Sequence, residues 1–119
     1  MIKNIEESFL NIQSNIIDIF SSLEDENKAE ISLDKWSRDE GGGGRTYVIE
    51  NGIFFDNCAV NFSSIQGEQL PQTALANNLK KEVKHGYKAM GVSVISHPKN
   101  PNVPTSHMNV RLFGILDKN

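Results

Sequence analysis

The chain has 119 residues, of which 38% are hydrophobic, and its formal net charge is −3. This length suits one small domain with a modest core, and the acidic balance argues against nucleic-acid binding, which needs a basic footprint. A single cysteine, Cys58, excludes an internal disulfide, and no apolar run is long enough to span a membrane. The N-terminal residues include Glu6 and Glu7 and do not show the basic and then apolar pattern of a signal peptide. We therefore expect a cytoplasmic protein.

The N-terminal segment is predicted to form a helix. Between residues 2 and 23 apolar side chains recur at steps of three and four, which places them along one helical face. We expect the helix to end near residues 24–27. Its apolar face has to be buried, most simply against a sheet.

Short strands are predicted after this helix. Apolar and polar residues alternate from Ile31, and residues 45–50 and 53–56 form the arms of a hairpin around Asn51-Gly52. Asn-Gly suits a type I′ turn, which needs positive φ at both central positions. Residues 58–65 form a further strand, in which Cys58 is expected to be a core residue rather than a nucleophile. Residues 70–84 are ambiguous between a short helix and an irregular segment.

A long hairpin is predicted near the end of the sequence. Residues 90–96 and 106–115 are strand-like, and the loop between them contains Pro98, Pro101 and Pro104. Proline fixes φ and has no N–H, so this connection should be stiff. A helix followed by antiparallel strands indicates an α+β fold, with residues 1–119 in a single domain.

This hairpin should gather polar side chains on one face of the sheet. Strand side chains alternate between faces, so residues 93 and 97 share a face, and so do residues 107, 109 and 111. Pairing about a loop centred on Asn102 would place Ser93 opposite Arg111 and His97 opposite His107. Such a patch suits an anionic ligand that also needs a proton moved. Its members are Ser93, His97, His107, Asn109 and Arg111.

Other site types fit the sequence less well. The four glycines at 41–44 match no phosphate-loop spacing, which leaves a flexible loop or a close approach of the backbone to another group. Two histidines are too few for the usual zinc site, and no serine lies in a nucleophile elbow.

Several segments, in the same order and spacing along nearly the whole chain, resemble the oxygen-dependent coproporphyrinogen III oxidases. They are residues 36–45, 60–63, 67–68, 89–93, 97–101, 104–107 and 109–111. The resemblance implies a homodimer and a sheet–helix sandwich, here an N-terminal helix packed on a flat antiparallel sheet. It implies a reaction of haem biosynthesis, in which dioxygen oxidatively decarboxylates two propionates of coproporphyrinogen III to vinyl groups. Protoporphyrinogen IX, carbon dioxide and hydrogen peroxide are the products, and no organic cofactor takes part.

The resemblance also implies roles for individual residues. It assigns His107 to proton donation, and His97 with His107 to a divalent metal. Substrate binding is assigned to Ser93, Asn109, Val110 and Arg111.

The family's chains are longer than this one, so we expect residues 1–119 to be the N-terminal part of the family domain, without its C-terminal part. Two hypotheses follow. The sequence encodes the substrate-binding part of a coproporphyrinogen oxidase, or it is a catalytically inert truncated fragment that only binds a tetrapyrrole or a partner chain.

Overall fold

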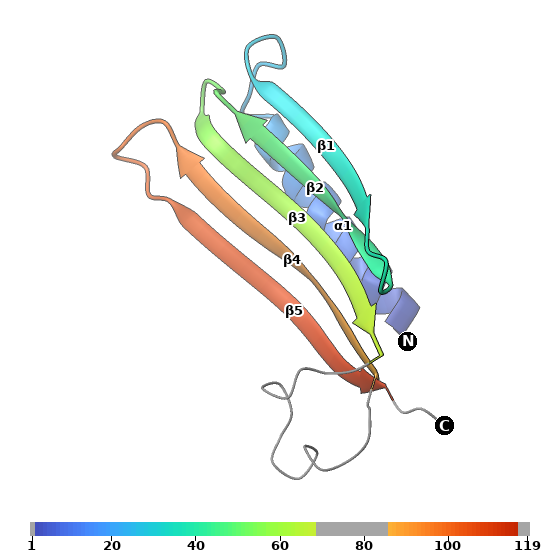
Figure 1. Ribbon diagram of the computed structural model, residues 1–119. Coiled ribbons are helices and arrows are strands. Elements are labelled where there is room, and N and C mark those ends of the chain that lie inside the picture. The colour runs from blue at the N-terminus through green and yellow to red at the C-terminus, as the bar shows by residue number, and fades with distance from the viewer. Residues whose placement is uncertain (1, 69–85, 117–119) are drawn as a thin grey trace.

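The computed structural model describes residues 2–68 and 86–116, which form one helix and five strands in a single antiparallel sheet. The elements are α1 (Ile2–Ser21), β1 (Glu30–Ser37), β2 (Gly42–Glu50), β3 (Phe55–Gly67), β4 (Gly86–Pro98) and β5 (Ser106–Leu116). The strands follow one another in chain order across the sheet, with α1 behind them (Figure 1). The predicted α+β fold is confirmed, whereas the interpretation of residues 70–84 lies outside the described residues.

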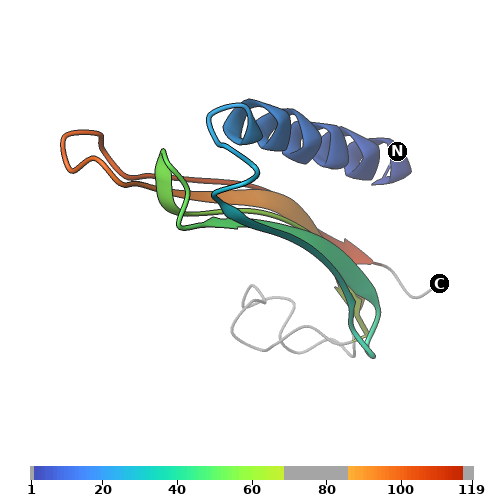
Figure 2. The same ribbon diagram turned by 90° about the horizontal axis from the view of Figure 1, so that it is seen from above.

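The helix covers only one face of the sheet. Figure 2 shows the sheet edge on, as a single layer that bends away from α1 toward one end. Among the described residues no element covers the opposite face, called the open face below. Nor does any helix in the described ranges have the length and apolarity needed to cross a membrane.

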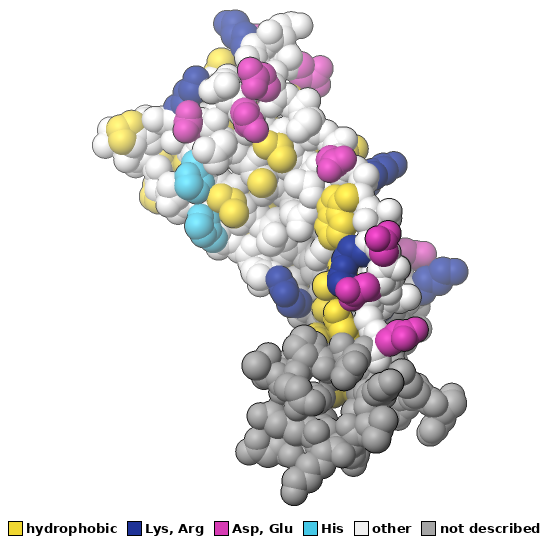
Figure 3. All heavy atoms as spheres, in the orientation of Figure 1, with side chains coloured by type: hydrophobic (Ala, Val, Ile, Leu, Met, Phe, Trp, Pro, Cys, Tyr) yellow, Lys and Arg dark blue, Asp and Glu magenta, His cyan; other side chains and the backbone are white. Residues whose placement is uncertain are grey.

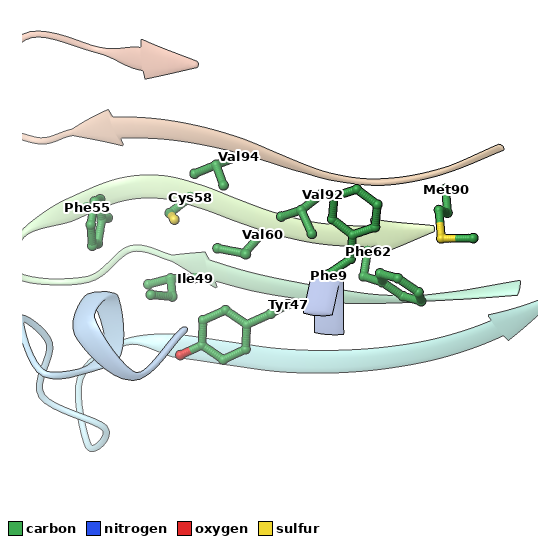
Figure 4. Packing of buried hydrophobic residues seen from close by; sticks show 10 residues of the cluster. All are labelled: Phe9, Tyr47, Ile49, Phe55, Cys58, Val60, Phe62, Met90, Val92 and Val94. Carbon is green, nitrogen blue, oxygen red and sulfur yellow. The ribbon is translucent and has the colours of Figure 1, made fainter. Parts of the chain in front are cut away.

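The core lies between α1 and the middle of the sheet, as the apolar stripe of residues 2–23 predicts. Alternate residues of β2, β3 and β4 point toward the helix, and each large apolar side chain buried there stabilises the fold by roughly 1.5–3 kcal/mol. The buried cluster is Phe9, Tyr47, Ile49, Phe55, Cys58, Val60, Phe62, Met90, Val92 and Val94 (Figure 4).

A buried glutamine ties α1 to the sheet. Gln13 is fully buried, and its Nε2 donates to the carbonyl oxygens of Arg45 (2.6 Å) and Val60 (3.0 Å). Its Oε1 accepts from Arg45 Nε at 2.7 Å, and Arg45 Nη2 donates to Ser14 Oγ at 3.0 Å. A buried amide would destabilise the fold without partners, so these bonds determine where the helix sits on β2 and β3.

A carboxylate joins the end of α1 to the loop between β2 and β3. Glu24 accepts the backbone N–H groups of Ile53 (2.7 Å), Phe54 (2.8 Å) and Phe55 (2.8 Å). A Cβ at Gly52 would collide with this carboxylate, which explains the glycine there. The loop is thus built around a residue almost thirty positions earlier in the chain.

Two details predicted for this hairpin are therefore wrong. In the loop only Asn51 has positive φ (52°), so the type I′ turn does not form. Residues 53–56 and 58–65 are not separate strands, because β3 runs without a break from Phe55 to Gly67, with a register irregularity between Phe55 and Asn57. The loop is longer than a two-residue turn because Glu24 accepts three of its backbone N–H groups.

The first testable prediction concerns the Gln13 anchor. Gln13→Leu removes three hydrogen bonds at a buried site, so the free energy of unfolding should fall by roughly 2–4 kcal/mol. Asn15→Ala, at an exposed position of the same helix, is the control and should change it by less than about 0.5 kcal/mol. Urea unfolding followed by circular dichroism measures both. Equal, small losses would show that Gln13 does not anchor the helix.

The second prediction concerns the Cys58 thiol, which is 1% exposed. Burial, and then the nearby Glu24 carboxylate, raise the pKa of Cys58 from 9.0 to about 11, which fits a core residue rather than a nucleophile. Because the folded state keeps the thiol protonated, the stability present below about pH 9 is lost as the pH rises toward 11. We expect a loss of roughly 2 kcal/mol from this group.

Burial also raises the pKa of Tyr47, so part of the alkaline loss belongs to that residue. Denaturant unfolding at several pH values between about 8 and 11 should therefore show a smaller loss in Cys58→Ala than in the unsubstituted chain. Identical pH dependence in the two proteins would rule out a contribution from the thiol.

Candidate functional site

The open face carries a row of polar side chains that crosses all five strands. Each member is the register partner of the next, so their side chains share this face. From β1 to β5 the row is Asp34, Thr46, Asn61, Ser93 and Asn109. Five adjacent polar residues, with no apolar one between them, form a stripe that suits a polar ligand, and the exposed side chains of Ile95 (42%) and Phe113 (47%) on the same face lie outside this stripe.

The next row of the same face has large side chains at its ends and small ones in the middle. Trp36 on β1 and Arg111 on β5 flank three small residues, across four strand spacings or roughly 19 Å. The small residues are Gly44, Ser63 and Gly91. Because the indole of Trp36 lies over Gly44, the low floor between the indole and the guanidinium consists of Ser63 and Gly91.

The glycine run at 41–44 lies next to this floor. Residues 42–44 belong to β2, and a Cβ at Gly44 would collide with the indole ring of Trp36 and the carbonyl of Phe62. Gly41 and Gly42 have φ of 124° and 90°, a region that side chains disfavour. The sequence left two interpretations of this run, a flexible loop and a close approach of the backbone to another group. The structure shows the close approach.

The five polar residues predicted to share a face do so, although their predicted register is wrong. Ser93 pairs with Asn109 instead of Arg111, whose partner is Gly91, and the partner of His107 is Ile95. The pairing is shifted by two residues. Because strand side chains repeat every two residues, such a shift changes the partners and leaves every side chain on its face.

The loop between β4 and β5 explains the shift. Val103 N–H donates to the carbonyl of Asn100 (3.0 Å), and Asn102 N–H donates to Asn100 Oδ1 (2.9 Å). This is a β-turn with Pro101 at its second position, where the fixed φ of proline is favourable. The pairing is consequently centred on Pro101 rather than on Asn102.

His97 and His107 lie side by side on the open face. Their rings stack with centroids 5.8 Å apart and planes 16° from parallel, although the residues are diagonal neighbours and not register partners. They are the adjacent cyan side chains in Figure 3. His97 is half-buried and His107 is exposed, so solvent and a ligand can reach the pair.

The imidazole pair could supply two ligands to a metal ion. Zinc sites usually use three or four protein ligands, and the described residues contain no cluster of three His, Cys, Asp or Glu side chains suited to a metal. The pair therefore fits one part of a metal site and does not complete one within the described ranges.

Val110 differs from the other residues that the resemblance assigns to substrate binding. It is the register partner of Val92, a core residue, so its side chain points to the helix side of the sheet and is 43% exposed there. A ligand on the open face can contact Val110 only through its main chain. The side chain therefore does not belong to the polar patch.

Three residues that the sequence interpretation did not single out form a hydrogen-bonded chain on the open face. Trp36 Nε1 donates to Thr46 Oγ1 at 3.1 Å, and Thr46 Oγ1 donates to Asn61 Oδ1 at 2.5 Å. The alternation of polar and apolar residues could have predicted that Thr46 and Asn61 lie on the face away from the core, because their neighbours in each strand are apolar. The contact between them depends on the register of three strands, which alternation does not provide.

Arg111 is an exposed cation at the edge of this surface. The described ion pair of Arg38 with Glu40 (3.0 Å) lies in the β1–β2 connection and does not involve it. Within the described residues Arg111 forms no ion pair. Its guanidinium is therefore available to an anion on the open face.

Comparison with known proteins agrees with the resemblance. Residues 4–119 match the profile of the family described as "Coproporphyrinogen III oxidase". Two similar relatives are the "Oxygen-dependent coproporphyrinogen-III oxidase" proteins of Prochlorococcus marinus strains AS9601 and MIT 9301, each 43% identical over 114 residues. The aligned region covers 93% of this chain and 33% of each relative, so the chain spans about a third of the length of these curated relatives. With nearly its whole length matched by the family profile, the chain belongs to the coproporphyrinogen III oxidase family.

Proposed function

We propose that the chain carries the substrate-binding floor of a cytoplasmic, oxygen-dependent coproporphyrinogen III oxidase of haem biosynthesis. The observation that carries the proposal is the open face, where Ser93, Asn109 and Arg111 lie beside the stacked pair His97 and His107 in a member of this family. The named activity of the relatives supports the choice of substrate and of dioxygen as the oxidant.

The substrate carries propionate carboxylates, and three side chains of the hairpin suit them. Arg111 offers a guanidinium that can donate two parallel hydrogen bonds to one carboxylate. Ser93 and Asn109, paired in register one row away, offer a hydroxyl and an amide. Val110, between Asn109 and Arg111, contributes through its main chain.

The reaction requires proton movement as well as binding. Each propionate loses its carboxylate as carbon dioxide and one hydrogen, as a proton and two electrons, from the β-carbon that is attached to the pyrrole ring, which leaves a vinyl group. The second proton that dioxygen needs comes from a donor in the site. The two electrons released, with two protons, reduce dioxygen to hydrogen peroxide. Imidazole is the side chain that ordinarily exchanges protons near neutral pH, so His107, exposed beside the carboxylate-binding residues, is proposed as the proton donor.

A divalent metal is a further component of the proposal. His97 and His107 would hold it as two of its ligands, and their stacked arrangement on one face is compatible with this. When bound, such an ion supplies Lewis acidity at the site.

The full-length form is proposed to be a homodimer. In the described sheet β5 is an edge strand, and Met108 and Val110 on its helix side are 40% and 43% exposed. An edge with exposed apolar residues is a surface on which further protein can pack. The area around β5 is therefore a candidate for contacts beyond these 119 residues.

The third prediction tests the guanidinium with a charge-matched control. Arg111→Ala should weaken binding of coproporphyrin III, the oxidised and fluorescent form of the substrate, by roughly tenfold or more. Lys99→Ala removes the same charge from an exposed position in the β4–β5 loop and should change affinity by less than about twofold. Fluorescence anisotropy of the porphyrin measures both. Equal losses would contradict carboxylate binding by Arg111.

The fourth prediction tests turnover. The chain is incubated with coproporphyrinogen III without oxygen, air is admitted, and the products are oxidised and separated by chromatography. We expect two vinyl groups and two molecules of carbon dioxide per tetrapyrrole, and a large loss of product with His107→Ala. Binding of the tetrapyrrole without any vinyl product would favour the alternative, a chain that only binds.

A further inference from the structure

We infer that Asn61 is an additional carboxylate-binding residue of the open face, held in position by Thr46 and Trp36. The inference rests on the proposed function, because it assigns Asn61 to a second carboxylate of the same tetrapyrrole. It adds a residue of β3 to the side chains proposed to bind substrate, which otherwise all lie on β4 and β5.

The hydrogen bonds orient the amide of Asn61. The indole N–H of Trp36 can only donate, so Thr46 Oγ1 accepts there and its own hydrogen is free for Asn61 Oδ1. With its oxygen turned toward Thr46, the amide directs its Nδ2 hydrogens away from β2. In this orientation Asn61 presents donors, which are the groups that a carboxylate needs.

The amide donors are accessible and have no partner among the described residues. Asn61 is half-buried, and its only described side-chain hydrogen bond is the one that its oxygen accepts from Thr46. Its register partner on β4 is Ser93, which pairs in turn with Asn109. Asn61 thus extends a row of neutral donors by one strand.

The distance from Asn61 to Arg111 suits a ligand with more than one carboxylate. Asn61 lies on β3 and Arg111 on β5, two strands away and two residues further along the same face. Their backbones are therefore roughly 12 Å apart. Ser63 and Gly91 are the low residues between them, so a ligand that reaches both meets no large side chain there. Arg111 supplies the charge, and Asn61 determines the orientation of the second carboxylate.

The isosteric substitution Asn61→Asp tests this inference. The carboxylate of the variant still accepts from Thr46, so the hydrogen-bonded chain survives, whereas the donors are replaced by a negative charge. We expect the affinity for coproporphyrin III to fall by roughly tenfold or more. Asn102→Asp adds the same charge at an exposed position of the β4–β5 loop, away from these side chains, and should change affinity by less than about threefold.

Variants of Thr46 test the positioning role in the same titration. Thr46→Val keeps the shape and removes the hydroxyl, so the amide loses its orientation and affinity should fall by roughly threefold. Thr46→Ser restores the hydroxyl and should return the affinity to that of the unsubstituted chain. If Thr46→Val weakened binding only through a general loss of packing, Thr46→Ser would not restore the affinity. Circular dichroism and urea unfolding establish that each variant is folded.

The outcomes separate this inference from the proposed function. If the unsubstituted chain binds coproporphyrin III and Arg111→Ala weakens binding while Asn61→Asp does not, the role of Asn61 is overturned and the proposed function stands. If the unsubstituted chain does not bind the probe, or Arg111→Ala has no effect, the proposed function itself is overturned. If Arg111→Ala and Asn61→Asp both weaken binding and Asn102→Asp does not, the inference and the proposed function are both supported.

Discussion

The buried amide of Gln13 fixes the position of α1 on the face of the sheet that its apolar residues select. Its hydrogen bonds to the Arg45 and Val60 carbonyls and from Arg45 Nε connect α1 to two neighbouring strands. Strand side chains alternate, so covering one face leaves the other to the intervening residues. Apolar burial thus creates a packed layer, which includes Val60 and Val92, and leaves an open layer that includes Asn61 and Ser93, while the hydrogen bonds of Gln13 hold α1 in place on the packed layer. A helix docked elsewhere would leave a different set of side chains for a ligand.

The open face links parts of the chain that carry the family resemblance but lie far apart in sequence. Trp36 covers Gly44, and the same indole reaches Asn61 through Thr46. The resemblance therefore includes residues that build the floor and residues that orient its polar groups. Removal of the Arg111 charge should therefore weaken binding and leave the sheet intact. Replacement of Gly44 by a larger residue should instead disturb the spacing of the strands, because its Cβ would collide with Trp36 and Phe62.

Local patterns predicted the elements well and their connections poorly. The helix from Ile2 and the two long strands follow from periodicity, which depends only on neighbouring residues. The turn at Asn51-Gly52 was predicted from the dipeptide alone, yet Glu24 organises that loop by accepting three backbone N–H groups. The β4–β5 register was predicted from an assumed loop centre, and the turn that begins at Asn100 moved it by two residues. Glu24 acts from about thirty residues away in the chain, whereas the turn at Asn100 is a local contact that strand periodicity does not describe.

Alternation and an assumed pairing centred on a loop residue predicted that Ser93, His97, His107, Asn109 and Arg111 share a face, and this prediction holds because a shift of the register by two residues leaves every side chain on its face. Similar motifs along the chain were enough to place it in its family. The stacking of His97 on His107 and the hydrogen bonds from Trp36 to Asn61 were decided only in the folded chain. Those contacts depend on the alignment of separate strands to within one residue, and that alignment is set by loops and by helix packing, which residue patterns within a strand do not encode.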